Sequence, residues 1–283
     1  MRKFFFYLFN DPYWIFEPLL RILYKIFTEN SLKKTFYKNQ LDKLIKTNKY
    51  KKDTDFDIYG PITEKNNQYE PEILDLARLY KLVKKKKPMT ILEFGVGYST
   101  LVMAQAIYEN KKKLKNNSKI GKIRNTKKFK LYCVDTSKKW INNTKKSLPS
   151  HLKDIVNFSV SPVDTITHNS EVCHTYKFIP DVNPDFIYLD GPHPTDPKGK
   201  INNVSFKCIE RTPISADVCL LESTLIPGSS IFVDGRTNNV RFLKRNLKRK
   251  YKFKWDRVGD TTLITLNEKF LGKLNKNSSY INF

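Results

Sequence analysis

Two glycines one residue apart follow an apolar stretch of the chain, within the segment ILEFGVGYSTLVMA at residues 91–104. Gly95 and Gly97 have no Cβ, so the backbone can turn tightly there and a ligand can approach closely. Ser99 or Thr100 can cap the apolar helix that follows, and the amides at its start attract a negative group. The spacing G-x-G-x-x-T lacks the third glycine of the dinucleotide-binding fingerprint. The segment therefore predicts a ligand-binding turn that is not built for a dinucleotide.

Carboxylates stand beside this turn and at the end of the next predicted strand. Glu93 comes just before the glycines. A carboxylate there would repel a pyrophosphate, but it could pair with an ammonium group. The strand predicted at 129–134 ends at Asp135, whose carboxylate can accept both hydroxyls of a ribose. The two residues favour a ligand that carries an amino group and a carboxylate over one that carries two phosphates.

The motif E-F-G-x-G-x-S-T, followed by a strand that ends in aspartate, resembles that of class I S-adenosylmethionine-dependent methyltransferases of the O-methyltransferase kind. The resemblance covers roughly residues 70–266 and does not extend to the first fifty residues. It implies an enzyme whose cofactor is S-adenosylmethionine. The cofactor residues that it implies are Glu93, Gly95 and Gly97 at the methionine portion, Ser99 at the start of the helix, Asp135 at the ribose and Asp164 near the adenine.

The end of the fourth predicted strand, at 185–189, is where the methyl acceptor is expected. Methyl transfer needs a nucleophile held in line with the methyl group, and often a base that takes its proton. Asp190 follows this strand, and we expect its carboxylate to face the crevice; a turn cap is the alternative. His193 is the candidate general base because histidine titrates near neutral pH; a solvated side chain is the alternative.

A further carboxylate, Asp234, ends the fifth predicted strand. Asp190 and Asp234 would then lie at the ends of neighbouring strands, where two carboxylates are candidate ligands for Mg²⁺. Metal-dependent O-methyltransferases resemble this pattern, but they usually have another Asp or Asn where this chain has Gly235. The alternative is that Arg236 anchors an anionic substrate.

The residues at the end of the fourth strand also bear on the acceptor atom. Enzymes that methylate adenine or cytosine nitrogens carry Asn/Asp-Pro-Pro-aromatic at this place. Here the similar segment 183–186 begins the strand, and Asp-Gly-Pro-His occupies 190–193. We therefore expect an oxygen acceptor on a small molecule, a sugar or a lipid-linked glycan. Two other hypotheses stay open: an RNA methyltransferase that uses basic residues at 110–128 and 240–250, and a non-catalytic membrane-associated binding protein on the same fold.

Strand and helix patterns alternate from residue 70 onwards. This alternation predicts the α/β class, with a Rossmann-like, doubly wound, mostly parallel sheet. Strand patterns at 251–255 and 261–266, around a turn, predict a terminal antiparallel pair. The predicted divisions are an aromatic and basic helical extension at 1–50, a linker or lid at 51–69, a methyltransferase-like catalytic domain at 70–270 and a tail at 271–283.

The N-terminal extension contains the segment YWIFEPLLRILYKIF at 13–27. Glu17, Arg21 and Lys25 are spaced four residues apart and would form one stripe of a helix, with apolar residues around the remainder. These charges argue against a bilayer crossing, which needs about 20 mostly apolar residues. Two interpretations stay open. Residues 1–28 could lie in the plane of a membrane surface, or the helix could pack on the main domain or on a partner subunit.

The chain carries a formal net charge of +24. This charge is compatible with nucleic acid or an acidic membrane as a partner. Much of it lies in Lys-Asn runs such as 111–117, which favours compositional bias on a solvated surface with a membrane-facing contribution from the N-terminus. Cys133 and Cys219 lie in apolar runs and no CxxC pair occurs, which is typical of reduced core thiols. We expect a cytoplasmic protein, associated with the inner face of a membrane if its N-terminal helix binds there.

Overall fold

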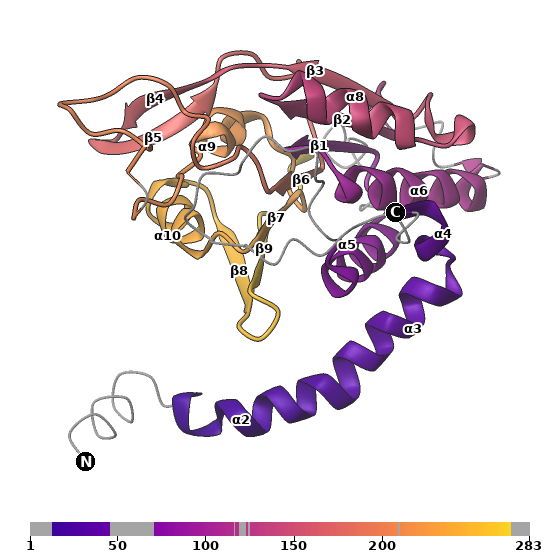
Figure 1. The fold of residues 1–283 in the computed structure, drawn as a ribbon. Helices are drawn as coiled ribbons and strands as arrows, with labels where there is room; N and C mark the ends of the chain where they lie inside the picture. Colours follow the sequence, from indigo (N-terminus) through magenta and orange to yellow (C-terminus); the bar gives the residue numbers. More distant parts are fainter. Residues whose placement is uncertain are drawn as a thin grey trace.

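The computed structural model describes residues 13–45 and 71–272, apart from residues 116, 119–122, 124 and 209. The predicted linker, the first residues of the N-terminal extension and nearly all of the predicted tail lie outside the described residues. The described part contains a large sheet with helices on both faces, and a separate two-stranded hairpin (Figure 1).

The large sheet has seven strands in the order β3-β2-β1-β6-β7-β9-β8. Their bounds are β1 Thr90–Phe94, β2 Lys130–Asp135, β3 Val156–Val160, β6 Phe186–Leu189, β7 Ser230–Asp234, β8 Tyr251–Asp256 and β9 Thr261–Leu266. Strands β3, β2, β1, β6 and β7 pair in parallel, whereas β9 is antiparallel to both β7 and β8. The predicted doubly wound, mostly parallel sheet with a terminal antiparallel pair is confirmed.

The order of the strands reverses between β1 and β6. From β1 the chain proceeds outward to β2 and β3, and it then returns to β6 on the other side of β1. In open parallel sheets, ligands bind beyond the carboxyl ends of the strands at such a reversal. The topology therefore directs attention to the turns that follow β1 and β6.

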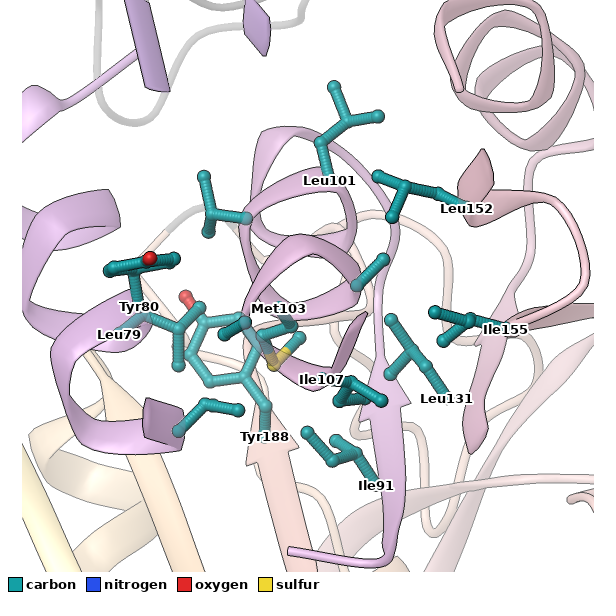
Figure 2. Close-up of a cluster of buried hydrophobic side chains, with 14 of the residues drawn as sticks. Leu79, Tyr80, Ile91, Leu101, Met103, Ile107, Leu131, Leu152, Ile155 and Tyr188 are labelled. Atoms are coloured by element: carbon teal, nitrogen blue, oxygen red, sulfur yellow. The ribbon is translucent and has the colours of Figure 1, made fainter. Parts of the chain in front are cut away.

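Two hydrophobic cores lie on the two faces of the sheet. Helices α5 (Ile73–Lys86) and α6 (Tyr98–Leu114) cover one face, and α9 (Asp217–Leu221) and α10 (Thr237–Asn246) cover the other, while α8 (Lys138–Ser147) contacts β2 and β3. Strand side chains alternate between the cores, so Ile91 packs with the first and Leu92 with the second. Figure 2 shows the first core, in which Met103 and Ile107 of α6 lie near Ile91 and Leu131 of the strands.

Helix α6 extends further than the sequence predicts. The expected helix covered 99–108, but α6 ends at Leu114, which is buried. The side-chain amide of Asn110, also buried, donates to the carbonyl oxygen of Val83 in α5 at 3.0 Å. Because the buried Asn110 side chain has a hydrogen-bond partner, the helix can continue past it. The first part of the loop predicted at 110–128 is therefore helical.

A hairpin between β3 and β6 was not predicted. It consists of β4 Val163–His168 and β5 Glu171–Tyr176, which pair with each other and not with the large sheet. The two turn residues, Asn169 and Ser170, have φ values of 46° and 64°. Left-handed values at both central residues are those of the two-residue turn that fits the twist of a hairpin. The hairpin packs in the second core through Val163, Cys173 and Tyr176.

The N-terminal extension is helical in most of its described residues. It comprises α2 (Tyr13–Leu23), the π-helical segment η1 (Tyr24–Glu29), α3 (Asn30–Lys38) and α4 (Leu41–Ile45). Leu32 and Phe36 of α3 are buried in the core that α5 and α6 share, and Leu41 and Ile45 of α4 join them. The second half of the extension is therefore part of the folded domain.

The ends of β1 and β6 meet through backbone atoms alone. The Gly191 amide donates to the Phe94 carbonyl oxygen at 2.5 Å, and the Asp190 amide donates to the same oxygen at 3.1 Å. Gly95 has a φ of 99°, and a Cβ on Gly191 would lie 2.6 Å from the Gly95 nitrogen. Both positions require glycine because no side-chain atom fits between the two backbone segments.

We predict that Gly191→Ala lowers the free energy of unfolding by about 1–3 kcal/mol, because the new methyl group forces two strand ends apart. Urea denaturation checks this. The matched control is Gly97→Ser, since a Cβ on Gly97 meets no atom within 4 Å and serine is a good residue before a helix. The control should change the free energy of unfolding by less than about 0.5 kcal/mol. Equal stability of the two variants would contradict the packing argument.

Candidate functional site

The turn after β1 leaves open space above one of its two glycines. Gly97 has an extended φ of 171°, which any residue can adopt, and no atom lies within 4 Å of the place where its Cβ would be. Neither backbone conformation nor packing therefore requires glycine at this position. Because Gly97 has no side chain, the start of α6 stays accessible. A ligand can therefore approach the backbone closely there.

Asp135, at the end of β2, holds this turn in place. Its Oδ2 accepts a hydrogen bond from the Val96 amide at 3.0 Å, and its Oδ1 accepts one from the Ser137 amide at 2.7 Å. Burial raises the pKa of Asp135 to about 6, against the opposing effect of the Ser137 amide. A carboxylate offers about four acceptor positions, so Asp135 can still accept hydroxyl groups of a ligand. Its predicted place beside the glycine turn is the one observed.

Glu93 lies beneath the turn and not at its mouth, which differs from the expectation. Its side chain points to the same face of the sheet as Ile91, toward α6, because strand residues alternate. Oε1 accepts from Ser99 Oγ at 2.5 Å, and Oε2 accepts from Thr100 Oγ1 at 2.7 Å and from Cys133 Sγ at 3.0 Å. Glu93 is fully buried. The carboxylate thus holds α6 against β1 and β2, and a direct contact with a ligand stays a prediction.

Ser99 shares this structural role. Its hydroxyl is engaged with Glu93, and it is Thr100 that accepts a hydrogen bond from the Gly97 amide, at 3.1 Å, at the start of α6. Burial raises the pKa of Glu93 to about 7, although the hydroxyl and thiol donors favour the ionised form. The sequence contains both hydroxyls at the right spacing, but it does not show that both donate to the carboxylate and that only Thr100 also accepts from the Gly97 amide.

Asp190 and His193 lie in the turn that follows β6, across from Asp135. The link between the two turns is Asp196, whose Oδ2 accepts from Thr136 Oγ1 at 2.5 Å and from the His193 amide at 3.2 Å. Asp190 is exposed, and its carboxylate makes no side-chain hydrogen bond in the part of the chain that the structure describes. The structure therefore brings Gly97, Asp135, Asp190 and His193 to one edge of the sheet, as the sequence predicted.

His193 is suited to take a proton at neutral pH. Burial lowers its pKa below the usual value, and Arg236 adds to this, whereas Asp196 opposes it. The imidazole is therefore mostly neutral at pH 7. Nδ1 lies 2.9 Å from Thr195 Oγ1 and accepts a hydrogen bond from the Thr195 amide at 3.3 Å. The amide favours the tautomer with the lone pair on Nδ1, whereas donation to the hydroxyl would leave the lone pair on Nε2.

Asp164 is not beside these residues in the large sheet. It lies in β4 of the hairpin, where its Oδ2 is 3.1 Å from Lys177 Nζ. Its predicted role near the adenine was based on a loop after β3, and the hairpin replaces that loop. A role of Asp164 near the adenine stays a prediction. The residue lies on the hairpin, which covers the second face of the sheet.

The donor set does not fit a divalent cation. Within the described ranges, no three His, Cys, Asp or Glu side chains form a group that could hold a metal ion. Asp234 accepts a hydrogen bond from Tyr188 Oη at 3.0 Å, and burial, with Asp75 and Asp190 nearby, raises its pKa to about 8. The predicted Mg²⁺ site at Asp190 and Asp234 is therefore not supported.

A guanidinium group lies where a metal was expected. Arg236 follows β7, and its Nη2 donates to the carbonyl oxygens of Asp190 and Pro192, the latter at 2.8 Å. Its Nη1 is buried and has no hydrogen-bond partner among the described residues. Desolvation by the surrounding protein raises the pKa of Asp190, and the positive charge of Arg236 opposes this. The cation beside the carboxylate thus belongs to the protein itself.

The hairpin contributes residues that sequence reasoning missed. His174 and Tyr176 are almost fully buried on β5, and their ring nitrogens and hydroxyl have no partner among the described residues. The Tyr176 ring lies 5.6 Å from the ring of Phe94, next to the glycine turn. The charge of Arg236 acts on both residues, although burial is the main cause that lowers the pKa of His174 to about 3. Only the unpredicted hairpin brings them here, so no local sequence signal could have identified them.

No protein-family model matches the sequence, and the search of curated proteins found no relative. Solved structures of methyltransferases are similar in fold. The O-methyltransferase TomG from Streptomyces achromogenes, in complex with SAM, is 12% identical, with 70% of this chain and 82% of that chain covered and a TM-score of 0.37. The SAH-bound methyltransferase PaMTH1 from Podospora anserina is 15% identical, with 70% and 80% covered and a TM-score of 0.42. An O-methyltransferase from Bacillus cereus in complex with SAH is 12% identical, with 84% and 91% covered and a TM-score of 0.36.

We predict that Asp234→Asn makes the protein more stable at pH 8 and leaves its stability near pH 4 unchanged. The folded-state pKa of about 8 lies above the unfolded value near 4, so wild-type stability falls as pH rises between them. Asparagine keeps an acceptor for Tyr188 and removes the titration. The gain at pH 8 should be about 1–3 kcal/mol, measured by urea denaturation across this range. Asp181→Asn, at an exposed position, is the control, and a variant curve parallel to the wild type would contradict the assignment.

We predict that His193 titrates below the usual histidine value of about 6.5, and that Asp196→Asn lowers its pKa further because a favourable negative charge is lost. NMR titration of the imidazole signals measures this, and His193→Gln assigns the resonance. His174 should show no titration between pH 5 and pH 8, since burial keeps it neutral. A pKa of His193 above the usual value, or one that Asp196→Asn raises, would show that the imidazole lies in a different environment.

Proposed function

We propose that this protein is an S-adenosylmethionine-dependent methyltransferase that methylates an oxygen atom of its acceptor. The observation that carries the proposal is the open space above Gly97 beside Asp135, at the strand reversal, with Asp190 and His193 on the opposite side. The resemblance of the residues around Gly95 to the class I methyltransferase motif supports the same conclusion.

The residues at this edge fit the cofactor. A group that approaches the start of α6 meets no side chain at Gly97, and the amides of a helix start favour the carboxylate of an amino acid. Asp135 keeps acceptor capacity for ribose hydroxyls while it holds the Val96 amide. S-adenosylmethionine supplies an electrophilic methyl group on a sulfonium centre.

The protein's own groups would prepare the acceptor. His193, neutral at pH 7, takes the proton of the acceptor hydroxyl. Asp190 carries an exposed carboxylate at the same turn, and Arg236 fixes that turn through two carbonyl oxygens. Thr195 and Asp196 position the histidine through its ring and its backbone amide. These residues bind and orient the acceptor and accept its proton, and none of these steps needs a metal ion.

Two unpartnered donors support an acceptor with additional oxygen atoms. Arg236 Nη1 and the Tyr176 hydroxyl are buried without hydrogen-bond partners among the described residues. Leaving such groups unsatisfied costs about 1–3 kcal/mol each, so a ligand oxygen or an ordered water would be bound favourably there. A sugar, a lipid-linked glycan or another small molecule rich in oxygen fits this surrounding better than an apolar acceptor.

We predict that the wild-type protein binds S-adenosylhomocysteine in isothermal titration calorimetry and that Gly97→Leu weakens binding at least about tenfold. The leucine side chain would occupy the space the ligand needs, and a loss of about 1.4 kcal/mol corresponds to a factor of ten. Asp135→Ala should weaken binding by a similar factor, because it removes the acceptor for the ribose and releases the Val96 amide.

Asp181→Asn serves as the control and should bind as the wild type does. Urea denaturation of each variant separates lost binding from lost folding. Absence of heat with the folded wild type would refute the proposed function, whereas wild-type affinity in Gly97→Leu would refute only the location of the site.

A further inference from the structure

Helix α2 and the segment η1 expose a continuous apolar surface. Spacings of three and four residues bring most of its side chains to one side of a helix. This surface, called the apolar face below, consists of Phe16, Leu19, Leu20, Ile22, Leu23, Ile26 and Phe27, which are between 38% and 71% exposed. Scattered exposed apolar residues are normal, but a contiguous patch of this kind marks an interaction site.

The helix faces its own domain with its polar side. The Tyr24 hydroxyl accepts a hydrogen bond from Arg78 Nη2 at 2.5 Å and lies 3.4 Å from Asp256 Oδ2. The Glu17 carboxylate lies 3.6 Å from Arg257 Nη2 in the β8–β9 turn. A helix that packs on its own domain normally buries its apolar stripe. The orientation here is the opposite, so the helix contacts the main domain while its apolar residues stay uncovered by the described part of the chain.

The dimensions of this helix suit the surface of a bilayer and not its interior. None of the helices in the described ranges is long and apolar enough to cross a membrane. The charged residues of α2 and η1 form one stripe, on which the 65% exposed side chain of Arg21 pairs with Glu17 at 2.7 Å. Figure 1 shows α2 running away from the helices that cover the sheet, so its outer side is accessible to a flat surface.

Charge distinguishes between the two occupants that such a face could have. A second copy of this chain would bring together two molecules that each carry a net charge of +24. An anionic lipid surface would instead attract this charge, by about 1 kcal/mol for each Lys or Arg close to the headgroups. Arg21 and Lys25 lie beside the apolar face, and Lys33 and Lys34 follow it in α3.

We propose that the apolar face docks in the plane of an anionic lipid bilayer, with apolar side chains among the acyl chains and the flanking basic residues at the headgroups. The polar contacts of Tyr24 and Glu17 hold the helix on the domain while its outer side binds lipid. Aliphatic and aromatic side chains with basic residues beside them are typical of in-plane membrane helices. The inference does not depend on the enzymatic activity.

The experiment is co-sedimentation of the full chain with two kinds of liposome, pure phosphatidylcholine and phosphatidylcholine mixed with phosphatidylserine. We expect strong binding to the mixed liposomes, weaker binding to the neutral ones, and a decrease as salt is added. The double variant Ile22→Asp, Ile26→Asp should bind the mixed liposomes at least about tenfold more weakly, because it removes two apolar side chains from the acyl region. Both positions are more than half exposed, so folding should be unaffected.

The matched control is Phe178→Asp, Leu220→Asp, which makes the same kind of change at two exposed apolar positions elsewhere. It should bind lipid as the wild type does. Equal binding of the two double variants, or no preference for phosphatidylserine, would overturn the proposal. So would a dimer in light scattering that Ile22→Asp, Ile26→Asp dissolves, since a second copy would then cover the face. Affinity for S-adenosylhomocysteine without liposomes should be unchanged in both double variants, so failure of docking and failure of the proposed function are distinguishable.

Discussion

The contact between two bare backbones at the strand reversal determines the form of the site. Phe94 presents one carbonyl oxygen to the amides of both Asp190 and Gly191. This arrangement is possible only because neither Gly95 nor Gly191 has a side chain. The turns after β1 and β6 are thereby held together, and Asp196 adds a second connection between the β6 turn and the end of β2. The relative positions of Asp135, Asp190 and His193 follow from these two links.

Carboxyl groups are concentrated at this edge, and each has different partners. Glu93 receives hydroxyl and thiol donors from α6 and β2, Asp135 receives backbone amides, and Asp190 has the charge of Arg236 beside it. Asp234 has only the Tyr188 hydroxyl and two neighbouring carboxylates, so its pKa is raised the most among those with a stated value, to about 8. The same carboxyl type can thus act as a structural tie, as an acceptor of backbone amides, or as a group with a strongly raised pKa, according to what surrounds it.

The sequence predicted the elements whose signals are local. The glycine turn, the parallel strands, the terminal antiparallel pair and the carboxylates at the end of β2 and after β6 were found from apolar patterns and from residues adjacent to them. The direction of Glu93 was missed because it depends on which face α6 covers, and a strand buried on both faces does not show this in its pattern. The hairpin was missed because Asn169-Ser170 is a weaker turn signal than Asn-Gly, and Tyr176 and His174 were missed with it.

The N-terminal helix shows how a surface element can be connected to the site. Tyr24 binds Arg78, Arg78 pairs with Asp75, and the charge of Asp75 raises the pKa of Asp234 and of Asp190. Polar contacts thus run from the inner side of the helix to Asp75 in α5, and the charge of Asp75 acts on the carboxyl groups at the ends of β6 and β7. If the outer side of the helix rests on a bilayer, these contacts fix the distance between the lipid surface and the edge of the sheet where an acceptor is expected. An acceptor attached to a lipid would then be presented to the site by the same helix that holds the protein on the membrane, which accounts for a polar side turned inward and an apolar side turned outward.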